Sequence, residues 1–147
     1  MPNARGIRNN NPGNIDYNPR NKWQGQLPPD PNIEKRFARF DTPENGIRAL
    51  GKLLLNYRGK DGMPGVGKPG IDTPVEFVNR WAPSVENDTN AYARSVALAI
   101  GVSPTTPIDV TNPAVLTGLV NAIISHENGS NPYLPSVIRE GVRRALL

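Results

Sequence analysis

The sequence contains no cysteine and a single histidine, His126, within 147 residues. Without cysteine the chain forms no disulfide and offers no thiolate to a metal, so the redox state of its compartment stays open. One histidine is also too few for the usual zinc sites. We therefore expect neither a metal site nor a cofactor.

The sequence also lacks a long apolar run. No stretch approaches the roughly 20 apolar residues of a membrane-spanning helix, and residues 1 to 8 lack the apolar core of a signal peptide. We therefore expect no signal peptide and no stable insertion in a membrane. Transport across a membrane would need another component to carry the protein.

The overall composition is that of a globular protein, with 37% hydrophobic and 20% charged residues. The length predicts a single domain spanning residues 1–147. A net charge of +4 and a pI near 9.7 favour acidic partners such as cell-wall polymer, a membrane surface or nucleic acid. Six arginines could suggest a nucleic-acid binder, but they are scattered among acids without a recognised DNA-reading motif, so we expect no nucleic-acid partner. They are Arg8, Arg36, Arg39, Arg139, Arg143 and Arg144.

Helix-start signals recur along the second two thirds of the chain. A capping residue followed by proline is favoured at a helix N-terminus, and apolar residues at helical spacing follow each start. About five helices are predicted, beginning near Pro43, Pro74, Thr89, Pro113 and Pro135.

The first 40 residues have a different character. Residues 1 to 32 are dense in Asn, Pro, Gly and Arg, which predicts loops and short strands, and regular helix is not expected there. Residues 33 to 40 alternate imperfectly between apolar and charged side chains, which suggests one arm of a small sheet. The predicted fold class is α+β, mostly helical, with a small sheet or extended lobe before the helices.

The end of the most apolar helix carries the leading catalytic candidate. Apolar residues from Val115 to Ile124 precede Glu127, and the small polar residues 128 to 131 follow it. A carboxyl half covered by an apolar helix end is desolvated, so its pKa rises while its tip faces a cleft. The alternative is a solvated carboxylate after a helix. His126 is a neighbour in sequence, but adjacent helical residues point in different directions, so a direct dyad is not expected.

Several other side chains could contact a sugar. Residues 5 to 15 carry more side-chain amides than turns require, and amides pair well with hydroxyl and acetamido groups, although turn formation explains Asn and Gly equally well. Trp23 and Tyr133 have polar neighbours, so we expect them to be exposed and able to stack on sugar rings. The candidate binding residues are Asn10, Asn11, Asn14, Trp23, Tyr92, Asn131 and Tyr133.

Three blocks of the chain, residues 5–15, 39–49 and 81–92, resemble phage and prophage virion or lysin proteins. Four shorter motifs are similar to those of the lysozyme-like superfamily of lytic transglycosylases and glucosaminidases, but in a rotated order with the Glu helix last. A circular permutation would explain this order, because the termini of compact domains often lie close together. The motifs are Asn10-Asn11-Pro12-Gly13-Asn14-Ile15, Arg36-Phe37-Ala38-Arg39-Phe40, Tyr92-Ala93 and His126-Glu127-Asn128-Gly129.

The resemblance implies a lysozyme-like domain that cleaves the bond between N-acetylmuramic acid (MurNAc) and N-acetylglucosamine (GlcNAc) in peptidoglycan. It implies Glu127 as general acid, Asn10, Asn11 and Asn14 as cleft hydrogen-bonders, and Tyr92 near the acid. Asn128 replaces the small hydroxyl residue that commonly follows the Glu. The expected partners are glycan strands and virion components, and the expected location is a phage virion or host cell, with action in the periplasm.

The mechanism depends on whether a second carboxylate lies near Glu127. Hydrolysis usually needs one within roughly 5 to 9.5 Å, whereas a lytic transglycosylase needs only one carboxyl, as acid and then as base. One well-placed Glu favours transglycosylation, with lysozyme-type hydrolysis next. A noncatalytic virion or wall-binding protein is the alternative. The possible second carboxylates are Glu34 and Asp88, with Asp41 and Glu86 as further candidates.

Overall fold

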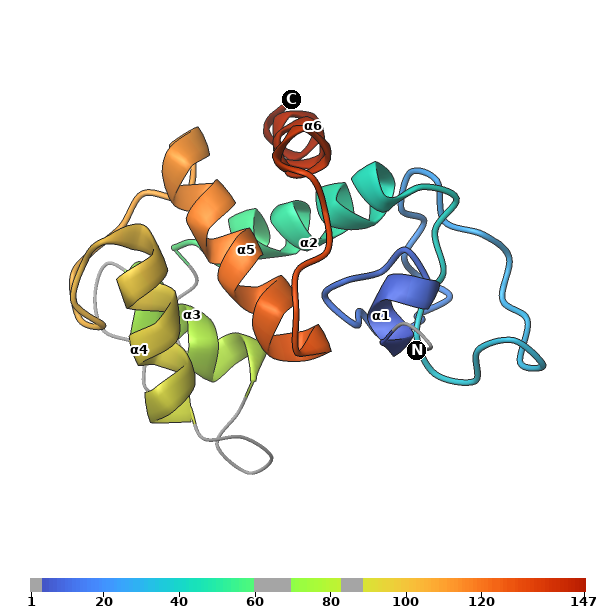
Figure 1. Cartoon of the computed structure of the whole chain (residues 1–147), viewed down its shortest axis with the longest axis horizontal. Coiled ribbons are helices and arrows are strands. Elements are labelled where there is room, and N and C mark those ends of the chain that lie inside the picture. Colours follow the sequence, from blue (N-terminus) through green and yellow to red (C-terminus); the bar gives the residue numbers. More distant parts are fainter. Residues whose placement is uncertain (1–3, 60–69, 83–88) are drawn as a thin grey trace. The chain divides into compact units, whose positions relative to one another are not determined.

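The computed structural model of the protein describes residues 4–59, 70–82 and 89–147. These residues form six α-helices (Figure 1). They are α1 (Arg5–Arg8), α2 (Pro43–Tyr57), α3 (Pro74–Trp81), α4 (Thr89–Ile100), α5 (Pro113–Asn128) and α6 (Pro135–Leu146). Among the described helices, none is long and apolar enough to span a membrane.

The predicted small sheet is absent from the described residues, so the α+β fold class was wrong and the protein is mainly helical. Residues 33–40 contribute only two isolated bridges, Asp16 to Phe37 and Gln26 to Phe40. The physical reason lies in Glu34. Its carboxylate accepts hydrogen bonds from the backbone N–H groups of Arg36 at 2.7 Å and Phe37 at 2.8 Å, which a neighbouring strand would otherwise bind.

The short helix α1 was not predicted, because residues 1 to 32 lack helical periodicity. A single turn is not stable by itself in water, so contacts distant in sequence must hold it. Arg5 in this turn forms a bidentate ion pair with Glu34, with N–O distances of 2.7 and 2.6 Å. Tertiary contacts rather than local propensity therefore explain α1.

The described chain divides into two compact units, Met1–Lys52 with Ile123–Leu147, and Leu53–Ala122. Helices α2 and α5 each contribute residues to both units. The prediction of one domain over 1–147 is not tested by this division and stays a prediction.

In the first unit, α6 packs across the N-terminal part of α2 (Figure 1). The sequence-predicted cap is present, because the backbone N–H of Asn45 donates to Thr42 Oγ1 at 3.2 Å. Gly141 of α6 lies so close to Ile47 of α2 that a larger residue would overlap it. Arg144 also donates to Asn45 Oδ1 at 3.1 Å. The C-terminal helix thus joins the N-terminal segment to form one core.

In the second unit, α3 begins with a complete capping box formed by Thr73 and Glu76. Helices α3 and α4 pack against each other. At the end of α3, the ring of Trp81 lies 6.3 Å from that of Tyr57 between centroids, and the Arg80 guanidinium lies 4.7 Å from the Tyr57 centroid.

Candidate active site and neighbouring pocket

Glu127 lies in the last turn of α5, just after the buried residues Ile123 and Ile124. Its side chain is half-buried. Burial raises the pKa of the Glu127 carboxyl, and a hydrogen bond from Asn14 and the nearby charge of His126 lower it by less. The partial negative charge at a helix C-terminus also opposes ionisation there. The site therefore favours a carboxyl that keeps its proton to higher pH than an exposed Glu.

Asn14 is the described side chain that the structure joins directly to Glu127. Its Nδ2 donates to Glu127 Oε1 at 3.4 Å. The residue has φ of 51°, a left-handed conformation that Asn tolerates better than most residues. The backbone of this turn therefore aims the amide at the carboxyl.

Gly6 of α1 lies against the same site. A methyl group added to Gly6 would lie 2.5 Å from Asn128 Oδ1 and 2.8 Å from Asn14 Oδ1. Both oxygens are buried and have no hydrogen-bond partner among the described residues. On its other side the Asn128 amide donates to the carbonyls of Pro12 at 2.8 Å and Ile124 at 2.9 Å. Asn128 thus ties the end of α5 to the N-terminal segment.

We predict that Asn14→Gly raises the pKa of Glu127 further. Glycine adopts a positive φ without strain, so this change removes the amide donor and keeps the backbone conformation. The amide stabilises the ionised carboxylate, and its loss must favour the protonated form. Carboxyl-detected NMR titration of Glu127 would measure the shift. A matched control is Asn10→Gly, which has the same φ of 51° but binds the Phe40 carbonyl instead. Equal behaviour of both variants would contradict the assignment.

Asn10 and Asn11, also predicted as binding residues, have different environments. Asn11 is fully buried, and its amide donates to the carbonyls of Ile15 and Ala38 and accepts the Ile15 N–H. These bonds hold the turn together and leave little of the side chain for a ligand. Asn10 is half-buried and donates to the Phe40 carbonyl at 3.1 Å. Turn formation, the alternative reading of this segment, therefore describes Asn11 well.

Glu34, a possible second carboxylate, is occupied by structural bonds. Besides Arg5 and the two backbone N–H groups, it accepts a hydrogen bond from Asn9 Nδ2 at 3.0 Å. Its side chain is 4% exposed. These bonds, that from Arg5 above all, hold the pKa of Glu34 far below its usual range. The carboxylate is therefore a permanent anchor for the loop, and few of its lone pairs remain for a reacting molecule.

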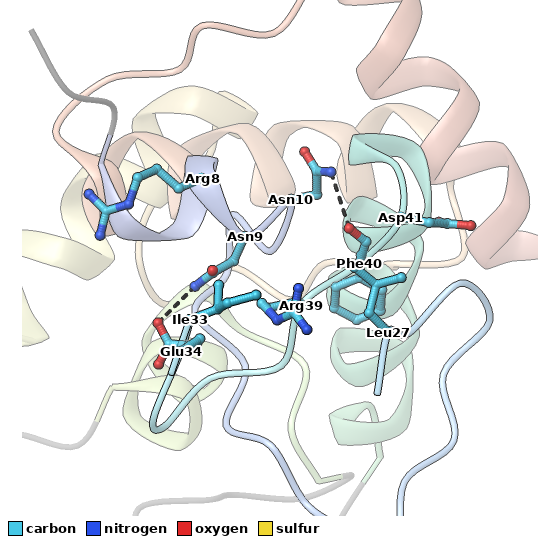
Figure 2. Close-up of a pocket in the computed structure, with 9 residues that line it drawn as sticks. All are labelled: Arg8, Asn9, Asn10, Leu27, Ile33, Glu34, Arg39, Phe40 and Asp41. Atoms are coloured by element: carbon cyan, nitrogen blue, oxygen red, sulfur yellow. Dashed lines mark hydrogen bonds between the residues drawn. The ribbon is translucent and has the colours of Figure 1, made fainter. Parts of the chain in front are cut away.

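A pocket of about 350 Å³ lies beside this anchor, within the first unit (Figure 2). Two arginines, Arg8 and Arg39, are among the residues that line it. In the sequence they are two of six scattered arginines, without a pattern that marks a site. The dense Arg and Asn content of residues 5 to 11 was the one available signal. The lining residues are Arg8, Asn9, Asn10, Leu27, Ile33, Glu34, Arg39, Phe40 and Asp41.

The chain is similar to a phage protein over nearly its whole length. It is 39% identical over 141 residues to "Protein P5" of Pseudoalteromonas phage PM2, and the match covers 94% of this chain and 79% of the relative. The chain belongs to the family of this phage protein. No family model matches it. The predicted phage context is thus confirmed at the level of a phage protein family.

Two aromatic side chains predicted to stack on sugar rings are less exposed in this member of the P5 family than the sequence suggested. Trp23 and Tyr133 are both half-buried, so the expectation of exposed rings was wrong. Their Nε1 and hydroxyl groups are buried without a hydrogen-bond partner among the described residues. Burial raises the pKa of Tyr133 to about 12. Asn131 accepts the Tyr133 N–H at 3.3 Å and shapes the turn after α5.

Three further candidates from the sequence are placed elsewhere or not described. Tyr92 lies in α4 of the second unit and is 1% exposed. Its predicted position near Glu127 stays a prediction, because the two residues belong to different units. Asp41 is exposed and accepts a hydrogen bond from Asn45 at 2.9 Å. Asp88 and Glu86 lie outside the described residues.

Proposed function

We propose that this phage protein cleaves the glycan strands of peptidoglycan at the MurNAc–GlcNAc bond, with Glu127 as general acid. The observation that carries the proposal is the half-buried Glu127 carboxyl, whose pKa is raised by burial at the end of an apolar helix. A general acid must hold a proton at working pH and release it to the leaving oxygen. The motif resemblance to lysozyme-like enzymes supports the same role.

The single-carboxyl mechanism of a lytic transglycosylase suits this site best. Protonated Glu127 gives its proton to the glycosidic oxygen as the C1–O bond breaks. The resulting carboxylate then takes the proton of the muramyl 6-hydroxyl, whose oxygen bonds to C1 and closes a 1,6-anhydro ring. No second carboxylate is needed. The Glu34 carboxylate is already bound by five donors, which disfavours it as the second group of a hydrolase. Lysozyme-type hydrolysis remains the next alternative.

The phage relationship supports a place of action as well. We propose that the protein acts from a phage virion or an infected host cell on periplasmic wall material, with glycan strands and virion components as partners. A noncatalytic virion structural or wall-binding protein is the second candidate, because the name of the phage relative states no activity. A fold with a suitable carboxyl does not by itself establish catalysis.

Mass spectrometry of the soluble products from purified Gram-negative sacculi would test the proposal. Incubation with the protein is expected to release muropeptides with anhydro-muramyl ends. Reducing muramyl ends would indicate a lysozyme, and reducing GlcNAc ends a glucosaminidase that cleaves the other bond. Sedimentation of the protein with sacculi without any released product would contradict the enzyme proposal and favour the wall-binding protein.

A further inference from the structure

The pocket beside Glu34 combines groups that complement a short acidic peptide. We propose that it binds the carboxylate-bearing peptide stem attached to the muramyl residue, as a substrate site separate from the Glu127 carboxyl. This inference rests on the proposed function. At about 350 Å³ the pocket falls within the usual size range of small-ligand sites. Every lining residue belongs to the first compact unit.

The charge of the pocket favours a carboxylate. Arg8 is exposed and Arg39 half-buried, and guanidinium groups bind carboxylates through paired hydrogen bonds. Two acids also line the pocket, but they differ in availability. The charge of Glu34 is balanced by its ion pair with Arg5. Figure 2 shows the Asp41 carboxylate directed away from Arg8 and Arg39. Figure 2 also shows the Arg8 guanidinium directed away from Arg39, so each arginine would attract an entering anion from a different side of the pocket.

The amides of the pocket favour a peptide over a simple anion. Asn9 donates to Glu34, and Asn10 donates to the Phe40 carbonyl (Figure 2). Both bonds use Nδ2, and within the described part of the chain no hydrogen bond uses either Oδ1. These two oxygens can accept N–H groups, which a peptide offers and a phosphate or acetate ion does not.

The apolar lining fits small side chains beside the carboxylate. Leu27 and Phe40 both line the pocket, and Phe40 is 2% exposed as part of the core (Figure 2). Ile33, which also lines the pocket, is 64% exposed. Burying its methyl groups against alanine side chains of a peptide would be favourable. The guanidinium groups, the amide oxygens and the apolar surface thus match the carboxylate, the N–H groups and the alanine side chains of a stem peptide.

Isothermal titration with a synthetic stem pentapeptide that carries no sugar tests this site directly. Arg39→Gln and Arg8→Gln are each expected to weaken binding by about ten- to a hundredfold, the value of a charged hydrogen-bonded contact. Arg139→Gln is the matched control, because Arg139 is exposed on α6 and does not line the pocket. Since Arg39 also donates to the Pro28 carbonyl at 2.9 Å, Arg39→Lys serves as a second variant that keeps the charge. It is expected to retain part of the affinity.

Three results would overturn the peptide assignment. They are no binding of the pentapeptide to the wild-type protein, equal binding to the wild type and both glutamine variants, and equal binding of a peptide with amidated carboxyls. Inorganic phosphate that competes as strongly as the peptide would also reject it in favour of a simple anion site. The Glu127→Gln variant separates this inference from the proposed function, because it is expected to bind the peptide as the wild type does. Peptide binding without any glycan cleavage would reject the enzyme alone, and cleavage without peptide binding would reject this site alone.

Discussion

The Glu127→Gln variant is expected to cleave peptidoglycan about 100 to 10,000 times more slowly than the wild type, the usual contribution of a general acid. Glutamine has nearly the same shape and can keep the hydrogen bond to Asn14, but it has no proton of suitable acidity to give. The rate of release of soluble muropeptides from sacculi would measure the effect. Thermal unfolding of the variant should match the wild type or exceed it, because burial penalises the charged form of Glu127.

A matched control for this variant is Glu44→Gln on α2. Glu44 is also half-buried in the first unit, and it lies in the first turn of its helix, where its charge contributes only a small dipole interaction. We expect its cleavage rate to stay within a factor of about two of the wild type, because helix-terminus charges act mainly on stability. Comparable activity of the Glu127→Gln and wild-type proteins would reject Glu127 as the acid.

The rate of glycan cleavage should depend on pH in a defined direction. Only the protonated form of Glu127 can give a proton to the leaving oxygen, so cleavage is expected to fall as the pH rises through its pKa. Because burial raises the pKa, this decline should lie at higher pH than for an exposed Glu. In the Asn14→Gly variant the decline should move to still higher pH, in the same direction as the NMR titration.

The Glu34→Gln variant is expected to lose about 3 kcal/mol of unfolding free energy at neutral pH, given the value of hydrogen bonds to charged groups. The amide of glutamine would face donors from Arg5, Asn9 and the backbone, and it can accept from only some of them. For a chain of this length the midpoint of thermal unfolding should fall by roughly 6 to 12 °C. Chemical denaturation at pH 7 would give the free energy.

The loss of unfolding free energy in the Glu34→Gln variant should depend on pH. The folded-state pKa of Glu34 is lowered, so its stabilising contribution is fully present above the ordinary pKa of Glu, near 4.3. It is lost progressively as the pH falls through that value toward the folded-state pKa. The difference between wild type and Glu34→Gln should therefore shrink below about pH 4.3. Glu140→Gln is the control, since Glu140 pairs with Arg143 at the surface, where ion pairs contribute little to stability. Equal losses in both variants would contradict the role of Glu34 as an anchor.

The helices of this protein could be predicted because their signals are local. Proline at the first helical position marks the starts of α2, α3, α5 and α6, and each begins where the sequence indicates. Thr73 and Glu76 complete a capping box within four residues. Such signals need no knowledge of the rest of the chain. The structure of residues 4–42 depends instead on Glu34, whose partners Arg5 and Asn9 are 29 and 25 positions away. No local sequence pattern predicts these bonds. For this reason a sheet was wrongly predicted and α1 was not predicted.

The candidate site likewise has some features that the local sequence predicts and others that depend on the fold. Glu127 could be singled out because an apolar helix ending on a carboxyl is visible in the sequence. The individual tasks of Asn10, Asn11 and Asn14 could not be separated, since all three share the same composition and turn propensity. Only the folded chain distinguishes Asn11, which closes a buried turn, from Asn14, which reaches the carboxyl. Arg8 and Arg39 likewise required the fold, because the pocket joins residues from separate loops.

The two sides of the Glu127 site come from opposite ends of the chain. Asn14 and Glu127 are 113 positions apart, and Asn128 and Pro12 are 116 apart. At a translation speed of about 5 to 20 residues per second, roughly 6 to 23 seconds pass between synthesis of the amide and of the carboxyl. A chain that ends before residue 127 therefore contains the amide but not the carboxyl. On the proposed function, such an unfinished chain cannot cleave glycan strands.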